Sequence, residues 1–139
     1  MNVDLLRESF DALRPNIQTL VDRFYSLLFE RYPQVRPMFA RTNMATQKQM
    51  LISALTLLVT NLEKPEILQG VLQPMGAKHV GYGVRDEHYD AVGLCLLDAM
   101  ADTAGPLWTD DLTREWSATY GAVAGMMKEG AAKAAAMAG

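Results

Sequence analysis

The sequence contains only two histidines, His79 and His88, so metal chemistry that depends on an imidazole has few places to occur. His79 lies in the segment AKHVGYGV at residues 77–84, and Tyr89 follows it ten residues later. A neutral imidazole is a good ligand for iron, and its second ring nitrogen is then free to be oriented by a backbone carbonyl or a tyrosine. A histidine at a helix end more often caps the helix or faces solvent, so the surrounding residues decide between these roles.

A proline-rich corner and a long amphipathic stretch precede His79. The corner, YPQVRPMF at residues 32–39, ends in Phe39, and the stretch opens near Gln47. Because about 3.6 residues make one helical turn, one face of the stretch carries Gln47, Leu51, Ala54 and Leu58. A polar residue that leads an apolar stripe suits an apolar cavity that needs one hydrogen bond at its mouth. A helical chain in which a histidine and a corner phenylalanine flank such a stretch is typical of a haem pocket.

Apolar residues recur at helical spacing in six segments, and no segment alternates as a strand would. We expect an all-α chain with helices near residues 5–13, 17–31, 46–62, 65–79, 86–100 and 109–127. Asp86 and Thr109 are the expected N-caps of the last two helices. Pro74 and Gly76 should break the fourth helix, which would let the His79 imidazole project sideways. The alanine-rich residues from about 130 onward are expected to fray.

The composition indicates one globular domain over residues 1–139, long enough to bury a core and enclose a ligand the size of haem. The net charge is -3 and the basic residues are scattered, which argues against a nucleic-acid surface. The single cysteine, Cys95, excludes an internal disulfide and fits a reducing cytosol. There is no signal peptide and no apolar run of about 20 residues. We therefore expect a cytoplasmic protein without membrane contact, present as a monomer or homodimer.

Several blocks of sequence, in the same order, make the chain resemble bacterial single-domain globins and the haem domain of flavohaemoglobins over essentially its whole length. These blocks are FYSLLF at residues 24–29, PQVRPMF at 33–39, NLE at 61–63, AKH at 77–79, HYDAVG at 88–93 and ATYG at 118–121. Several blocks in order are far more specific than any single motif. The resemblance implies a globin fold, with helices packed around haem b.

The resemblance implies that His79 is the proximal ligand of the haem iron. It places Phe39 in a stack on the porphyrin face and Tyr89 beside the proximal imidazole. It also brings Lys78 toward a haem propionate.

On the distal side, the resemblance places Tyr25, Gln47 and Leu51. Oxygen on ferrous haem acquires partial negative charge, so a hydrogen-bond donor aimed at it stabilises the complex. The phenol of Tyr25 stays protonated near neutral pH and can donate, and the Gln47 amide can donate directly or through Tyr25. The apolar wall of Leu51 and Phe39 keeps out water that would promote oxidation of the iron. His88 lies beside the expected helix cap and is assigned no role.

One position departs from the flavohaemoglobin pattern. In such proximal sites a glutamate of the last helix joins the tyrosine in bonding the imidazole, and counting from Tyr120 that position is occupied by Ala131. Glu129, the nearest acid, is two residues earlier and therefore about 200° round the helix. Either the alignment shifts locally or the carboxylate is missing, and a strongly electron-donating, peroxidase-like imidazole is then not expected.

The leading functional interpretation is a haem protein that binds oxygen reversibly, for transport or storage, with NO and CO as further ligands. The main alternative is a nitric oxide dioxygenase that converts NO and O2 to nitrate. These 139 residues contain no Gly-rich dinucleotide motif, so that enzyme would need a separate reductase.

Two other classes of protein fit the sequence less well. A gas sensor would require an output domain, and the alanine-rich tail is a poor transmitter. A di-iron carboxylate bundle would require inward Glu-x-x-His pairs. The residues three positions before the two histidines are Gly76 and Arg85, so neither histidine belongs to such a pair.

Overall fold

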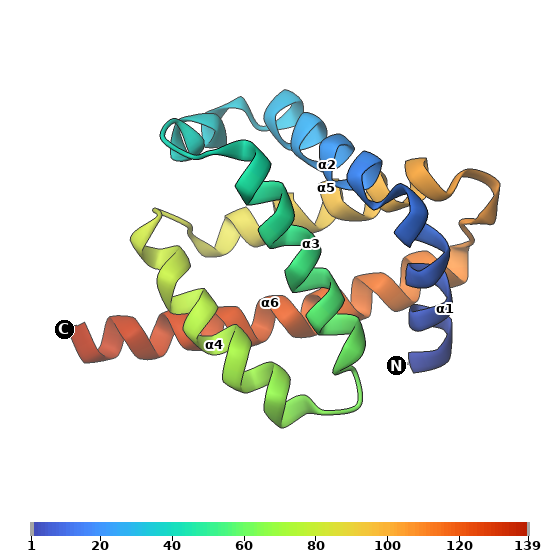
Figure 1. Cartoon of the computed structure of the whole chain (residues 1–139). Helices are drawn as coiled ribbons and strands as arrows, with labels where there is room; N and C mark the ends of the chain where they lie inside the picture. The colour runs from blue at the N-terminus through green and yellow to red at the C-terminus, as the bar shows by residue number, and fades with distance from the viewer. Residues whose placement is uncertain (1, 139) are drawn as a thin grey trace.

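The computed structural model describes residues 2–138, which form six α-helices joined by short turns (Figure 1). The helices are α1 (Val3–Leu13), α2 (Ile17–Arg31), α3 (Met44–Thr60), α4 (Pro65–Gly81), α5 (Asp86–Ala104) and α6 (Asp110–Ala138). Three short 3₁₀ helices lie between them: η1 (Arg14–Asn16), η2 (Pro33–Phe39) and η3 (Gly105–Leu107). No strand occurs among the described residues, and the all-α prediction is confirmed.

Polar side chains cap three of the six helix starts, those of α1, α3 and α6. The side chain of Asn2 accepts a hydrogen bond from the Leu5 amide at 3.1 Å, and that of Thr109 accepts one from the Leu112 amide at 3.3 Å. Such caps satisfy amide groups that the first turn of a helix leaves without partners. The prediction for Thr109 is thus confirmed.

Two predicted helix starts are wrong by one or two residues. The side chain of Asn43 caps α3 by accepting from the Thr46 amide at 3.2 Å, so α3 begins at Met44 and not at Thr46. Asp86 is the first residue of α5 and not its N-cap, which is Arg85. The carboxylate of Asp86 still lies in the first turn, where negative charge is favourable to a helix.

The predicted break in the fourth helix is also wrong, since α4 runs without interruption from Pro65 to Gly81. Pro74 removes a single backbone hydrogen bond, and its side chain is on the exposed side of the helix. Gly76 faces α6 so closely that a Cβ there would overlap the backbone oxygen of Met127. The glycine therefore allows two helices to touch and does not end one.

The last helix spans the width of the molecule, and α4 crosses it near its C-terminal end (Figure 1). Regular helix continues to Ala138, through the alanine-rich segment in which we expected it to dissolve from about residue 130. Alanine has the highest helix propensity of all residues. The alanine-rich segment also contacts α4: the Lys133 ammonium donates a hydrogen bond to the Gln73 side-chain oxygen at 3.0 Å.

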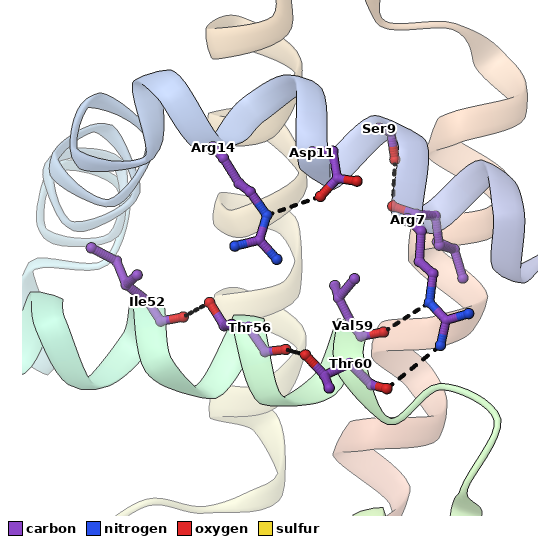
Figure 2. Close-up of polar contacts among 9 residues, drawn as sticks. Arg7, Ser9, Asp11, Arg14, Ile52, Thr56, Val59 and Thr60 are labelled. Carbon is purple, nitrogen blue, oxygen red and sulfur yellow. Dashed lines mark hydrogen bonds and ion pairs between the residues drawn. The ribbon is translucent and has the colours of Figure 1, made fainter.

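One arginine of α1 forms hydrogen bonds with the C-terminal end of α3 (Figure 2). The Nε of Arg7 donates to the Val59 carbonyl at 3.3 Å, and one of its terminal nitrogens donates to the Thr60 carbonyl at 3.5 Å. The last carbonyl groups of a helix have no hydrogen-bond donors within the helix, so they can accept hydrogen bonds from an arginine of another element. These contacts hold α3, which carries part of the candidate site, against α1.

Candidate functional site

A predominantly apolar cavity of about 240 Å³ lies at the centre of the molecule, and residues of α2, η2, α3, α4, α5 and α6 line it. Six of the residues singled out from the sequence lie in this lining: Tyr25, Phe39, Gln47, Leu51, His79 and Tyr89. They come from five separate elements, of which α2 and α4 lie along the upper and lower edges of Figure 1. The fold therefore gathers side chains that are up to 64 residues apart in the sequence.

His79 lies near the end of α4, half-buried, with its Nδ1 atom 2.7 Å from the backbone oxygen of Met75. A carbonyl oxygen can only accept a hydrogen bond, so Nδ1 must carry the proton and donate it. In a neutral imidazole the other nitrogen, Nε2, then keeps its lone pair. This is the tautomer that a metal ligand needs, oriented by a backbone carbonyl.

Tyr25 and Gln47 form the polar pair of the cavity. The Gln47 side-chain amide donates to the Tyr25 hydroxyl oxygen at 3.1 Å, and the tyrosine side chain is buried. Burial raises the pKa of Tyr25, and the hydrogen bond from Gln47 offsets only part of that effect. Because Tyr25 accepts from Gln47 and stays protonated, its own O–H remains free to donate to a third group.

Aromatic rings hold Tyr25 in place. The ring centroid of Phe39, the last residue of η2, lies 6.0 Å from that of Tyr25 and 5.4 Å from that of Phe29, both in edge-to-face geometry. Edge-to-face contact is one of the two favoured geometries of aromatic pairs. The corner that the two prolines create thus presents Phe39 to the cavity while it fixes the position of the tyrosine.

Tyr89 is buried in the cavity wall, and burial raises the pKa of its phenol. Among the described residues no hydrogen bond joins Tyr89 to His79, whose Nδ1 is already bonded to Met75. The hydroxyl of Tyr120 donates to the Tyr89 backbone oxygen at 2.6 Å, and the Lys128 ammonium lies 5.6 Å from the centre of the Tyr89 ring. Tyr89 thus lies near one cation, Lys128, while the negative charge of Asp86 adds to the rise in the pKa of its phenol.

The described cavity lining contains no carboxylate. Glu129, the nearest acid to the position of Ala131, is exposed and accepts a hydrogen bond from the Gln73 side chain at 3.1 Å. Of the two explanations that the sequence left open, this arrangement favours a missing proximal carboxylate.

The structure differs from expectation at His88, whereas the contact of Lys78 with a haem propionate stays a prediction. Lys78 is exposed and does not belong to the cavity lining, whereas His88 does. The Nδ1 atom of His88 accepts a hydrogen bond from the Arg85 backbone amide at 2.9 Å, so in the neutral ring Nε2 carries the proton. His88 therefore offers a donor at the edge of the cavity, where the sequence assigned it no role.

The sequence predicts a helix near residues 109–127, but it does not identify the apolar stripe of this helix as cavity wall. The stripe consists of Trp116, Tyr120, Val123 and Met127, all of which line the cavity. Their helical spacing was a visible signal of burial, but nothing in it separates contact with a ligand from contact with other side chains.

The residues present suit a flat apolar macrocycle that carries iron. His79 supplies a nitrogen lone pair from α4, Tyr25 supplies a free donor from α2, and the rest of the lining is almost wholly apolar. Among residues 2–138 no three His, Cys, Asp or Glu side chains gather as a metal site, as a di-iron centre would require. No helix in the described part of the chain is long and apolar enough to cross a membrane.

Comparisons with known proteins agree with this geometry. The globin family model matches residues 22–127. A flavohemoprotein of Bacillus subtilis is 29% identical over 124 residues, which cover 88% of this chain and 31% of the relative. A flavohemoprotein of Rhodopirellula baltica is 30% identical over 133 residues, which cover 93% of this chain and 33% of the relative. The chain thus spans about a third of the length of these relatives.

Solved structures are similar over nearly the whole chain. An engineered carbene transferase made from a "putative nitric oxide dioxygenase" of Rhodothermus marinus is 31% identical and has a TM-score of 0.87, with 97% of this chain and 94% of that chain covered. A bacterial globin of Campylobacter jejuni is 28% identical and has a TM-score of 0.83, with 94% of each chain covered. The chain belongs to the globin family, which implies a haem cofactor, and it resembles bacterial globins and the corresponding part of flavohemoproteins.

Proposed function

We propose that the protein holds haem b in the central cavity and binds oxygen reversibly, with His79 as the residue that would hold the iron through Nε2. When bound, ferrous haem supplies an iron that coordinates O2, NO or CO. The observation that carries the proposal is the hydrogen bond from Gln47 to Tyr25, which leaves the tyrosine proton free to donate into the cavity. A donor there stabilises oxygen, on which partial negative charge develops, more than it stabilises carbon monoxide.

The other cavity residues support this role by excluding water. Phe39 and Leu51 are partly buried apolar side chains in the lining, beside the polar pair. Little water can then reach the iron to assist its oxidation, and the hydrogen bond from Tyr25 is stronger in the less polar surroundings. The contact of the exposed Lys78 with a haem propionate stays a prediction.

Replacing Tyr25 with phenylalanine is expected to speed oxygen release by roughly tenfold or more, because a hydrogen bond to a partly charged acceptor contributes on the order of 1.5–3 kcal/mol. The Gln47→Leu variant should show a smaller increase, because Gln47 acts through Tyr25. Stopped-flow measurement of oxygen dissociation tests both. Carbon monoxide dissociation is the control and should change little in either variant. Equal oxygen release from Tyr25→Phe and wild-type protein would remove Tyr25 from the proposal.

A second candidate function is nitric oxide dioxygenation, in which NO, O2 and one electron from ferrous haem give nitrate and leave ferric haem. The name of the similar Rhodothermus marinus protein favours it, as do the flavohemoprotein relatives. These 139 residues carry no Gly-rich dinucleotide motif, so the electron that restores ferrous haem would come from a reductase outside them.

Mixing the oxygenated protein with one equivalent of nitric oxide is expected to give one equivalent each of nitrate and ferric haem. With NADH alone the reaction should then stop, and adding a flavin reductase should restore turnover. Nitrate analysis and the visible spectrum of the haem follow both products. If the single turnover produces no nitrate, the dioxygenase function is wrong and oxygen binding alone remains. Sustained turnover with NADH and no reductase would contradict the need for a partner.

A further inference from the structure

A second hollow, of about 430 Å³, lies beside the haem cavity and shares one residue with it. Tyr25 belongs to both linings, and the remaining members of the second are Asp22, Ser26, Phe29, Arg36, Met44 and Lys48. These residues come from α2, η2 and the first turns of α3. The hollow and the haem cavity therefore adjoin at Tyr25.

Charged side chains line part of this hollow, whereas the lining of the haem cavity is almost wholly apolar. The Lys48 ammonium lies 3.0 Å from the Asp22 carboxylate, and this contact is the main cause of a lowered pKa for Asp22, which therefore stays ionised. The Arg36 guanidinium lies 4.7 Å from the centre of the Phe29 ring, and no carboxylate among the described residues pairs with it. Two positive charges and one negative charge leave the hollow with a net charge of about +1, in a chain of net charge -3.

We infer that this hollow is the passage through which small anions move between solvent and the haem cavity, an inference that rests on the proposed function. O2, NO and CO are neutral and can cross an apolar cavity. An anion such as nitrate is strongly disfavoured there without a compensating partner. Arg36 provides that partner, because no carboxylate among the described residues offsets its charge, whereas Lys48 is paired with Asp22. The Tyr25 hydroxyl accepts from Gln47 and keeps a proton that can donate to the anion. A net positive hollow also raises the local concentration of anions.

The inference predicts opposite effects for two charge changes in the hollow. In the ferric haem-loaded protein, Arg36→Gln should slow azide association by roughly two- to fivefold at low ionic strength, and Asp22→Asn should speed it by a similar factor. Both differences should shrink as salt screens the charges. In the ferrous protein, carbon monoxide is neutral, and its association rate should be the same in all variants.

The control is Lys64→Gln, which removes one positive charge from an exposed residue outside the hollow. Stopped-flow measurement of the azide association rate compares Arg36→Gln with Lys64→Gln and with the wild type. If Arg36→Gln and Lys64→Gln slow azide equally, only the net charge of the protein counts and the inference is wrong. If Arg36→Gln also slows carbon monoxide, the residue shapes a general route and the anion-specific passage is wrong. Failure of the wild-type protein to bind haem or carbon monoxide would instead overturn the proposed function itself.

Discussion

Replacing His79 with alanine is expected to abolish stable haem binding while leaving the helical fold in place. His79 is the cavity imidazole whose Nε2 lone pair is free, because its Nδ1 donates to the Met75 carbonyl. His88 cannot take over in its present tautomer, because its Nδ1 accepts from Arg85 and its Nε2 therefore carries the proton. The variant should lose the haem absorption of the wild type, or release haem to a stronger acceptor protein far faster, with an unchanged far-ultraviolet circular dichroism spectrum.

Two comparisons make the His79 experiment specific. Adding free imidazole to the haem-reconstituted variant should restore the wild-type visible spectrum, since a soluble ligand can occupy the space left by the side chain. His88→Gln keeps an acceptor for the Arg85 amide and a donor toward the cavity, so it should retain the wild-type iron coordination. A His79→Ala protein with wild-type haem content and an unchanged spectrum would show that the iron ligand is another residue.

The six helices are predictable because their signal is local. Apolar residues at i, i+3 and i+4 specify a helix regardless of what the helix packs against. The boundaries depend on single hydrogen bonds, which are less visible. Asn43 begins α3 earlier than its apolar pattern does, and Arg85 precedes α5 although its side chain is not a typical cap.

The error in α4 has a different origin. Proline and glycine inside a helix are unfavourable in isolation, so local propensity predicts a break at Pro74 and Gly76. Tertiary packing overrides this local preference for a break, because Gly76 lies against the backbone of Met127, which is 51 residues later in the sequence. No local pattern contains that distant contact.

The site shows the same division between local and distant information. Periodicity put Gln47 and Leu51 on one face, and the structure has both in the cavity lining. The position of His88 was not predictable, because it lies in the first turn of α5, where a hydrogen bond with the Arg85 amide sets its side-chain direction. His88 turns into the cavity wall as its ring accepts from the Arg85 amide, whereas Lys78 faces solvent.

The close approach of α4 and α6 leads to the second large expected effect, a loss of stability in Gly76→Ala. The added methyl group would overlap the backbone oxygen of Met127, which cannot move away by rotating a side chain. The helices must separate or distort, and overpacking of this kind costs about 1–3 kcal/mol or more of the free energy of unfolding. Urea unfolding of the haem-free protein measures this loss in the free energy of unfolding.

Gly70→Ala is the matched control, since nothing lies within 4 Å of its added methyl group. There the helix should gain up to about 1 kcal/mol.

A double variant tests whether the two helices respond as one contact. Gly76 of α4 faces the backbone of Met127 in α6, and Gly130 of α6 faces the backbone of Gln73 in α4. In each helix the glycine follows three residues after the backbone position that faces the other helix's glycine. Once the helices have moved apart for one methyl group, the second should add little, so Gly76→Ala with Gly130→Ala should destabilise less than the sum of the single variants. The same displacement should speed haem loss, because His79 lies three residues beyond Gly76 on the helix that moves. Additive destabilisation by the two variants, with wild-type haem retention, would mean that each glycine is accommodated locally and that α4 keeps its position.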